Sequence, residues 1–545
     1  MLLQIGGKML AKKYHAKESE KKWQDFWQEK GIYKFKSNSE QPVYSIDTPP
    51  PTVNGKIHIG HIFSYSQAEI MARYKRMKGY NVFYPFGFDD NGLPTERLVE
   101  KTHGIKAHET TREDFTQMCL AETCELEKQF RKLFISAGFS CDWDQEYSTI
   151  NPKAQKISQK SFIDLYYKKK VYFSNAPALW CTECQTAIAQ AELETKEIPS
   201  LFNYLKFFIE GKDEYVEIAT TRPELLAACQ CIFIHPEDEK NKHLIGEMIK
   251  VPLFGFTVPV LEDEKVELGK GSGVVMCCTF GDLTDLEWYK KYNFSFKEAI
   301  LQDGTMSELC GKYAGLSVIN ARKAIIADLI EQDHMIKQEK IAHNVAAHER
   351  CGTPMEITIK KQWFIDILSN KQEYLDAGNE IKWYPAHMRT RYQNWVENLE
   401  WDWCISRQRY FGVPFPVWYC KSCGEVLIAD QNDLPVNPLT DSPNKTCECG
   451  CREFVPEHDI MDTWATSSVT PFINLNWDDE KKFKSEMVPM SVRPNAHDII
   501  RTWDFYTIVK SLYHTGKIPW KDVMISGHVM ASKGEKISKR KGNST

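Results

Sequence analysis

His58 and His61 are the two side chains near the start of the sequence whose type and spacing best suit chemistry on a phosphate. They occupy positions i and i+3 where a helical pattern begins at about Gly60 and continues to Met77, so both imidazoles would lie on one face of its first turn. Backbone N–H groups and the helix dipole favour anions there. Imidazole donors could contact phosphates as charge builds on them in a transition state. Taken alone, the pattern also fits two surface histidines.

A second candidate phosphate-binding segment, Lys536-Ile537-Ser538-Lys539-Arg540, lies close to the end of the sequence. Alone, it also fits a disordered basic tail. Because it follows the histidine pair in the same chain, the interpretation as a lysine loop over phosphates is favoured.

The elements that would position the histidines form the start of a parallel sheet. An apolar strand, Val43 to Thr48, runs into a proline triplet that ends it. The helix then follows and ends at Gly79, and Tyr80 to Phe86 is typical of the next strand. Strand, loop, helix and strand make a βαβ unit, which predicts a Rossmann-type α/β domain that binds a nucleotide.

These segments resemble a known family. The run from Pro49 to His61 resembles the first signature of class I aminoacyl-tRNA synthetases, and Lys536 to Asn543 resembles the second, with Ile537 and Arg540 where Met and Ser are usual. The resemblance implies that ATP is bound with Mg²⁺. It assigns catalysis to His58, His61, Lys536, Ser538 and Lys539, and ATP binding to Thr52, Asn54, Gly60, Lys536 and Lys539.

Further segments resemble the valine, isoleucine and leucine branch of this family: Phe86 to Asp89, Asn398 to Gln408 and Asp462 to Trp464. The segment from His497 to Trp503 is similar to the members that use valine. The resemblance therefore implies ATP-dependent activation of valine and its transfer to tRNA(Val). An isoleucine enzyme is the nearest alternative. A truncated or diverged chain that acts only as an editing hydrolase or RNA-binding module is the alternative from another class.

By the same resemblance, the carboxylate of Asp89 would hold the ammonium group of the amino acid. Pro50 or Pro51 and Trp464 would form the walls of a small apolar pocket. Rigid walls can exclude isoleucine by steric overlap. They cannot strongly reject threonine, which has nearly the shape of valine.

A β-rich insertion between about residues 200 and 340 would answer that shortfall. Ala219 to Glu224 and Phe280 to Asp285 resemble two strips of the hydrolytic editing domain in this branch, although Leu225-Leu226 stands where a threonine is common. The implied editing residues are Thr220, Thr221, Arg222, Asp282 and Asp285. Asp285 would bind the ammonium group, Asp282 could accept from the threonine hydroxyl, and the others would line the ester and the tRNA terminus.

Cysteine spacing predicts one or two structural zinc sites. Two x₂-spaced pairs flank the insertion, and closing the insertion would bring together Cys181, Cys184, His348 and Cys351. A local ribbon offers five thiols for four places, of which we favour Cys420, Cys423, Cys447 and Cys449, with Cys451 in reserve. Four protein ligands leave no open position on the metal, so neither site is expected to be catalytic.

The 545 residues suggest several domains, and 42% apolar residues are ample for sizeable cores. We expect a helical segment at 1–40, catalytic halves at 41–196 and 344–545, an editing insertion at 197–343 and a zinc ribbon at about 418–455, without an anticodon-binding domain.

A net charge of −5 argues against a uniformly basic coat but allows local RNA contacts. No apolar run approaches a membrane span and no signal peptide is evident, so a cytoplasmic protein is expected. We also expect it to be a monomer.

Overall fold

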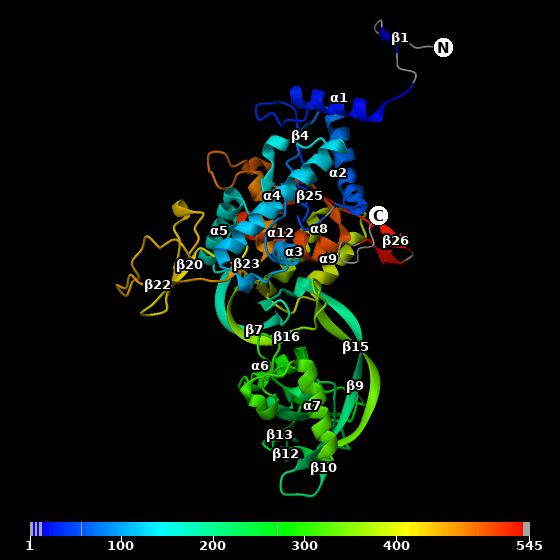
Figure 1. The fold of residues 1–545 in the computed structure, drawn as a ribbon, viewed down its shortest axis with the longest axis vertical. Helices are drawn as coiled ribbons and strands as arrows, with labels where there is room; N and C mark the ends of the chain where they lie inside the picture. The colour runs from blue at the N-terminus through cyan, green and yellow to red at the C-terminus, as the bar shows by residue number, and fades with distance from the viewer. Residues whose placement is uncertain are drawn as a thin grey trace. The chain divides into compact units, whose positions relative to one another are not determined.

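The computed structural model describes residues 4–5, 8–9, 13–55, 57–269, 271–532 and 534–537. The chain forms two compact units (Figure 1). The outer unit comprises Met1–Tyr172 and Ile365–Thr545, and the inserted unit comprises Phe173–Phe364. The inserted unit is wider at both ends than the 197–343 expected for the insertion, and it includes the first cysteine cluster. Across the described part of the chain, no helix is long and apolar enough to cross a membrane.

A parallel sheet forms the centre of the outer unit. β3 (Val43–Ser45) pairs with β4 (Asn81–Phe83), and β25 (Trp520–Ser526) pairs with both β24 (Met490–Ala496) and β17 (Lys382–Tyr384), in every case parallel. A parallel bridge between Ile46 and Val492 joins the two groups, and the Asp47 N–H donates to the Val492 carbonyl over 3.0 Å. The strand order is therefore β4–β3–β24–β25–β17. Strands from both sides of the insertion share one sheet, which confirms the predicted split α/β domain.

Helix α2 (Ile59–Met77) covers this sheet and packs against β24. Its inward face carries Tyr65, Ala68 and Ala72, which pack with an aromatic cluster that includes Phe86 and Phe134. The helix ends at Lys78, and Gly79 follows with a φ of +84°, a left-handed conformation that favours glycine. The apolar spacing and the terminal glycine thus produced the helix that the sequence predicted.

The outer unit contains further helices and short strands. Its other helices are α1 (Ala16–Glu29), α3 (Leu93–His103), α4 (Arg112–Ser136), α5 (Pro152–Tyr167), α8 (Lys371–Glu380), α9 (Met388–Glu397), α10 (Thr463–Ser467), α11 (Thr470–Asn474) and α12 (Phe505–Thr515). Its short strands are β1 (Gln4–Ile5), β2 (Lys8–Met9), β5 (Gly87–Phe88), β6 (Tyr147–Ser148), β18 (Trp403–Cys404), β19 (Ser406–Arg407), β20 (Val417–Cys420), β21 (Val426–Ile428), β22 (Phe454–Pro456), β23 (Ile460–Met461), β26 (Met530–Ser532) and β27 (Glu535–Lys536).

The inserted unit is built on a mostly antiparallel sheet. Its strands are β8 (Thr186–Ala187), β9 (Leu193–Ile209), β10 (Tyr215–Thr220), β11 (Cys229–Ile234), β12 (Met248–Lys250), β13 (Thr257–Glu262), β14 (Val274–Cys278) and β15 (Met335–His348). The sheet order is β10–β9–β12–β13–β11–β14, with β15 also paired to β9. Helix α7 (Val318–Glu331) buries its apolar face in the core, and α6 (Leu283–Tyr292) follows β14. β7 (Val171–Cys181) and β16 (Glu356–Ile365) carry the chain between the two units.

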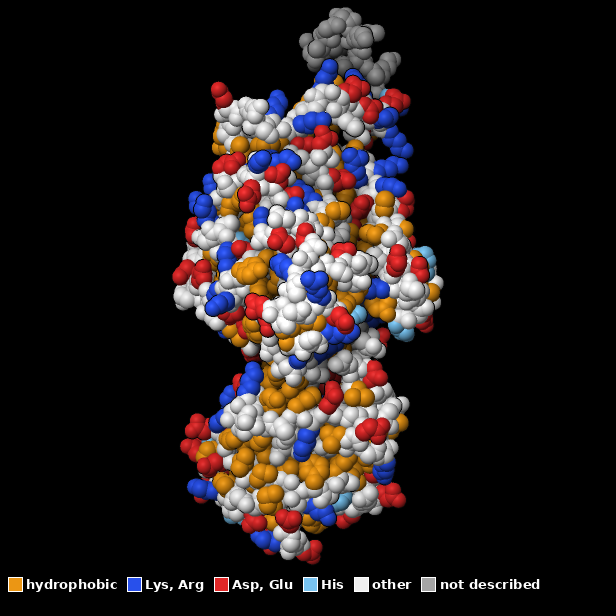
Figure 2. Space-filling view, turned by 90° about the vertical axis from the view of Figure 1, so that its left-hand side faces the viewer, with side chains coloured by type: hydrophobic (Ala, Val, Ile, Leu, Met, Phe, Trp, Pro, Cys, Tyr) orange, Lys and Arg blue, Asp and Glu red, His pale blue; other side chains and the backbone are white. Residues whose placement is uncertain are grey.

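Figure 2 shows that acidic and basic side chains are interspersed over the face in view. No large area of that face carries one sign of charge, in keeping with a net charge of only −5.

Candidate active site and metal centres

The two histidines form the cap of α2. His58 is the N-cap residue, and its Nδ1 accepts from the Gly60 N–H over 3.1 Å. The Nδ1 of His61 accepts from the His58 N–H over 3.4 Å, and the two ring centroids are 4.1 Å apart. Because both Nδ1 atoms accept, each neutral ring carries its proton on Nε2. A Cβ added to Gly60 would lie 2.9 Å from Cε1 of His58, so glycine is needed for this arrangement.

The lysine segment begins from the same sheet. The side chains of Ser64, in α2, and Ser526, at the end of β25, are hydrogen-bonded over 2.9 Å. The chain then continues into the antiparallel pair β26–β27, where Met530 faces Lys536 and the Ile537 N–H donates to the Val529 carbonyl over 3.1 Å. The structure describes the backbone of Lys536, whereas Ser538 and Lys539 lie outside the described residues.

The predicted amino-acid site is centred on Asp89, which is buried just beyond β5. Its N–H donates to the Pro51 carbonyl over 3.0 Å, and its carbonyl accepts from the Val53 N–H over 2.9 Å. The carboxylate accepts from Thr149 Oγ1 over 2.9 Å and from Ser467 Oγ over 3.5 Å. Ser467 belongs to α10, the short helix that carries Trp464. The proline segment, Asp89 and the helix of Trp464 are therefore neighbours.

The loop between β3 and α2 makes a tight turn at the two other predicted ATP ligands. Thr52 pairs with Asp89 in a parallel bridge, and the Asn54 N–H donates to the Thr52 carbonyl over 3.0 Å. Gly55 follows with a φ of +117°. The turn joins the amino-acid site to the histidine cap within a few residues.

Next to Asp89 lies a pair of carboxyl groups, those of Asp90 and Glu127, that the sequence did not indicate. Asp90 accepts from Ser148 Oγ over 2.8 Å and from Thr149 Oγ1 over 3.2 Å, and it is hydrogen-bonded to Glu127. Burial and the neighbouring charge of Asp90 raise the pKa of Glu127 to about 9. The pair therefore holds a proton at neutral pH, which limits the negative charge beside Asp89.

In the inserted unit, Arg222 is held by acidic side chains. Its guanidinium donates to Glu224 over 3.0 Å and to both carboxylate oxygens of Glu356 over 2.9 Å. A longer bond of 3.4 Å reaches the Gly281 carbonyl. Arg222, which was expected to line the ester and the tRNA terminus, has its guanidinium engaged in this ion-pair network. Arg222 thus links the strip from Ala219 to Glu224 with the strip from Phe280 to Asp285. Its partner Glu356 had not been predicted from the sequence.

The two aspartates predicted to take part in editing, Asp282 and Asp285, have different surroundings. Asp282 caps α6, and its Oδ1 accepts from the N–H groups of Thr284 and Asp285 over 2.8 and 3.0 Å. Asp285 is buried and accepts from the Gly281 N–H over 2.7 Å and the Cys278 N–H over 3.3 Å. Burial, followed by the charge of Asp282, raises the pKa of Asp285 to about 8. Thr220 lies at the end of β10, where its Oγ1 accepts from the Arg222 N–H over 3.0 Å.

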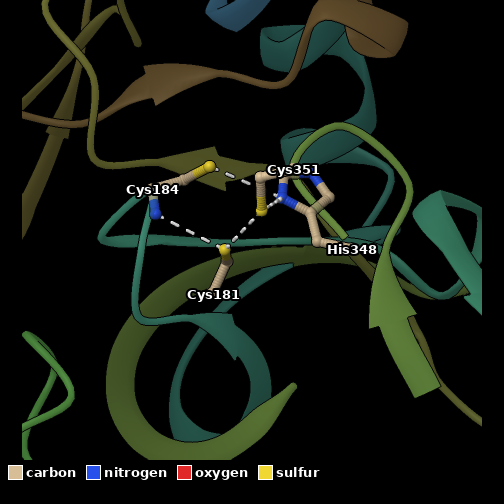
Figure 3. A group of neighbouring side chains, drawn as sticks. All are labelled: Cys181, Cys184, His348 and Cys351. Atoms are coloured by element: carbon tan, nitrogen blue, oxygen red, sulfur yellow. Dashed lines mark hydrogen bonds between the residues drawn. The ribbon is translucent and has the colours of Figure 1, made fainter. Parts of the chain in front are cut away.

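The first cysteine cluster lies within the inserted unit (Figure 3). The sulfurs of Cys181 and Cys351 are 3.5 Å apart, and Nδ1 of His348 lies 3.6 Å from Cys184 Sγ and 3.5 Å from Cys351 Sγ. All four donor atoms lie within 4.8 Å of one another. Thiolates about 2.3 Å from one ion in a tetrahedron would be about 3.8 Å apart. The four side chains therefore fit a tetrahedral ion after small shifts.

The ribbon between β20 and β22 brings together the second set. Sulfurs are 3.5 Å apart in the pairs Cys420–Cys449 and Cys423–Cys447, and the four donors again lie within 4.8 Å. The Sγ of Cys451 instead accepts from the Glu453 N–H over 3.3 Å. The tertiary structure thus separates the fifth thiol from the other four.

Residues 22–545 match the family of class I tRNA synthetases for isoleucine, leucine, methionine and valine. The chain belongs to this family.

The synthetase is similar over nearly its whole length to proteins named valine–tRNA ligase. It is 48% identical to that of Rickettsia conorii, over 98% of this chain and 67% of the relative. Identity to the protein of Thermoplasma volcanium is also 48%, over 96% and 66%. Identity to that of Methanocaldococcus jannaschii is 47%, over 96% and 60%. The chain thus spans about two thirds of the length of these relatives or slightly less.

The fold of the synthetase is also that of a solved structure, the LeuRS–tRNA–LeuAMS ternary complex of Agrobacterium radiobacter K84. The TM-score is 0.54 with 19% identity, and the likeness covers 98% of this chain and 70% of that one. At this identity the comparison supports the class I fold alone.

One further aromatic side chain of the synthetase lies at the predicted amino-acid site. The ring centroids of Trp503 and Trp464 are 6.5 Å apart, with their planes at 61°. The sequence pattern marked the segment from His497 to Trp503 but gave Trp503 no role. Its place opposite Trp464 depends on the packing of α10 against the turn that precedes α12.

Proposed function

We propose that this synthetase activates valine with ATP, transfers it to tRNA(Val), and removes mischarged threonine in its inserted unit. The observation that carries the proposal is the identity of about 48% to valine–tRNA ligases over 96–98% of this chain. We include in the proposal that the synthetase acts in the cytoplasm, because tRNA is charged where translation uses it. We also include that it acts as a monomer.

In the activation step, the valine carboxylate attacks the α-phosphate of ATP in line, and pyrophosphate leaves. This forms valyl-adenylate without a covalent enzyme intermediate, so the protein acts by positioning and by stabilising charge. His58 and His61 would donate from Nε2 to the phosphates, because their Nδ1 atoms already accept backbone N–H groups. Lys536 and Lys539 would neutralise the departing pyrophosphate. Mg²⁺ bound with ATP supplies further charge neutralisation.

The amino-acid site would select by charge and by size. Asp89 can pair with the substrate ammonium while the hydroxyls of Thr149 and Ser467 fix its carboxylate. Pro50 or Pro51 and the indole of Trp464 would limit the length of the side chain. Such apolar walls cannot reject threonine strongly, since its hydroxyl replaces a methyl of similar size.

Editing would take place in the inserted unit. Asp285, which accepts from the Gly281 N–H, would bind the ammonium group of the misacylated residue. Thr220, Thr221 and Asp282 would supply polar contacts to the ester and the threonine hydroxyl. A polar site of this kind can reject valine, because the acceptors for the threonine hydroxyl would be left unpaired. Arg222 would support these strips through Glu224 and Glu356 rather than contact the substrate.

The two cysteine clusters would each hold a structural zinc ion. Cys181, Cys184, Cys351 and His348 match the donor set and spacing that zinc prefers, and so do Cys420, Cys423, Cys447 and Cys449. Bound zinc would keep these thiols deprotonated and join segments that are distant in the chain.

The deciding experiment is amino-acid-dependent ATP–pyrophosphate exchange by this chain with valine, isoleucine, leucine or threonine. We expect strong exchange with valine, weaker exchange with threonine and little with isoleucine. In the variant Asp89→Asn, KM for valine should rise about a hundredfold, because the substrate ammonium loses its charged partner. Preference for isoleucine would favour the isoleucine alternative. Folded protein without exchange, but with hydrolysis of threonyl-tRNA, would leave only the editing function.

A further inference from the structure

Behind the predicted amino-acid site lies a fully buried arginine. Arg493 projects from β24, and both its side chain and that of its ion-pair partner Asp47 have 0% exposure. The Nη2 of Arg493 lies 3.2 Å from Asp47 Oδ2 and 3.4 Å from Thr507 Oγ1. The pair spans the junction at which the two halves of the parallel sheet meet, since Asp47 is bonded to the backbone of Val492.

Two tryptophans cover the rest of the guanidinium. Its Cζ lies 4.4 Å from the ring centroid of Trp503 and 4.2 Å from that of Trp520. The Nε and Nη1 atoms are buried and have no hydrogen-bond partner among the described residues. Attraction between a cation and an indole is strongest when both are removed from water. Arg493 therefore fixes the position of both rings.

The same arginine is connected to both sides of the amino-acid site. Trp503 faces Trp464 at 6.5 Å on one side. On the other side, Asp47 lies two residues before Pro49, the first residue of the proline segment, and its carboxylate accepts from Trp520 Nε1 over 2.9 Å and from Asn474 Nδ2 over 3.2 Å. A shift of Arg493 would move Trp503 and the start of the proline segment together.

Stability alone does not explain this ion pair. Removing two charges from water is costly, and well-packed apolar side chains often replace a buried pair without loss of stability. A rigid planar cation that stacks on two indoles has instead the property needed to hold rings at a fixed separation.

We propose that Arg493 is a positioning residue that holds Trp503 against Trp464 and so sets the discrimination of valine from isoleucine. This inference rests on the proposed activation of valine and adds a residue that does not contact the substrate.

The test compares Arg493→Lys and Arg493→Met with the unaltered full chain in ATP–pyrophosphate exchange. KM for valine should rise at least about tenfold, whereas KM for ATP should stay within about twofold, because the side chains that Arg493 bonds or stacks on, Asp47, Thr507, Trp503 and Trp520, are not part of the histidine cap. The ratio of kcat/KM for valine to that for isoleucine should fall roughly tenfold, since the walls lose their fixed separation. Lysine should not rescue the methionine variant, because it lacks the planar group that stacks on both rings.

Arg76 offers a matched control. Its guanidinium also lies over an aromatic ring, 4.8 Å from Tyr33, and bonds the Ser140 carbonyl over 2.7 Å, but it is in the last turn of α2. Arg76→Met should lower the melting temperature without changing the discrimination. An equal change of discrimination in Arg76→Met and Arg493→Met would indicate a merely structural role and overturn the inference.

Two further variants address folding and coupling. If Arg493→Met does not fold, Asp47→Asn/Arg493→Met removes the ion pair without leaving the Asp47 carboxylate unpaired in the core. The loss of discrimination in Trp503→Phe and in the arginine variant should not add when the two are combined, because both act through one ring. Additive losses, or unaltered discrimination in folded Arg493 variants, would overturn the inference alone. Absence of exchange by the unaltered chain would overturn the proposed function and this inference with it.

Discussion

Asp89 and Asp285 are two buried carboxyl groups to which we assign the same task, the binding of a substrate ammonium group. Their surroundings differ. Asp89 accepts from two side-chain hydroxyls, whereas Asp285 accepts from two backbone N–H groups and lies near the charge of Asp282. In the inserted unit, a bound substrate ammonium would therefore meet a carboxyl group whose pKa is raised above the usual value.

The raised pKa of Asp285 predicts a pH-dependent stability. The unfolded carboxyl ionises at about 3.9 and the folded one at about 8, so the folded state binds the extra proton between these values. Its contribution is fully present below about pH 3.9 and is lost as the pH rises to about 8. Between pH 6 and 8, the opening free energy of α6 should fall by about 2 kcal/mol. Amide hydrogen exchange of the full chain would measure this fall.

The variant Asp285→Asn is the control for that measurement. It carries no ionisable group at this position, so the pH-dependent part assigned to Asp285 should disappear while the other pH effects remain. The same slope in the variant and in the unaltered chain would show that Asp285 is not the responsible group.

At the scale of elements, the long strand pair β9–β15 explains how the first metal cluster forms. The two strands are paired in antiparallel register over almost their whole length, and His348 at the end of β15 faces Leu193 at the start of β9. The end of β15 is thereby returned to the region of Cys181 and Cys184. Strand pairing, rather than sequence proximity, brings the four donors together.

Zinc content should distinguish the fifth thiol of the ribbon. We expect two zinc ions per chain. Cys447→Ser should lose one of them, because a structural site with four ligands binds zinc more weakly when one thiolate is removed. Cys451→Ser should keep both, since Cys451 bonds to Glu453 and lies outside the cluster of donors. Atomic absorption on the purified variants measures the content. Loss of zinc in Cys451→Ser with retention in Cys447→Ser would contradict the assignment.

At the scale of the whole molecule, the parallel sheet of the outer unit is completed by strands from both sides of the insertion, while the inserted unit has a sheet and a core of its own. Each predicted site is contained in one unit: the histidine cap and Asp89 in the outer unit, Asp285 and Arg222 in the inserted one. This division predicts that activation and editing can be separated by mutation.

Asp285→Ala should leave valine-dependent pyrophosphate exchange unchanged and slow the hydrolysis of threonyl-tRNA roughly a hundredfold, because the substrate ammonium loses the carboxyl group that would bind it. Asp303→Ala serves as the control, since Asp303 is an exposed aspartate in a turn of the same unit. Deacylation of purified threonyl-tRNA measures the effect. Equal hydrolysis by the two variants would remove Asp285 from the editing site.

The sequence by itself determined the local geometry of the sites. A histidine pair spaced i, i+3 before an apolar helical pattern fixes a cap at the start of α2. Cysteines separated by two residues supply half of each metal cluster. Both spacings bring their side chains together within one turn of the chain, so they depend on neighbouring residues alone. The family resemblance extended this to Asp89 and Asp285. The tertiary structure alone decided that Glu127 shares a proton with Asp90, that Glu356 holds Arg222 and that Arg493 pairs with Asp47. These partners are far apart in the chain, and only the packing of distant elements removes them from water and makes their charges interact.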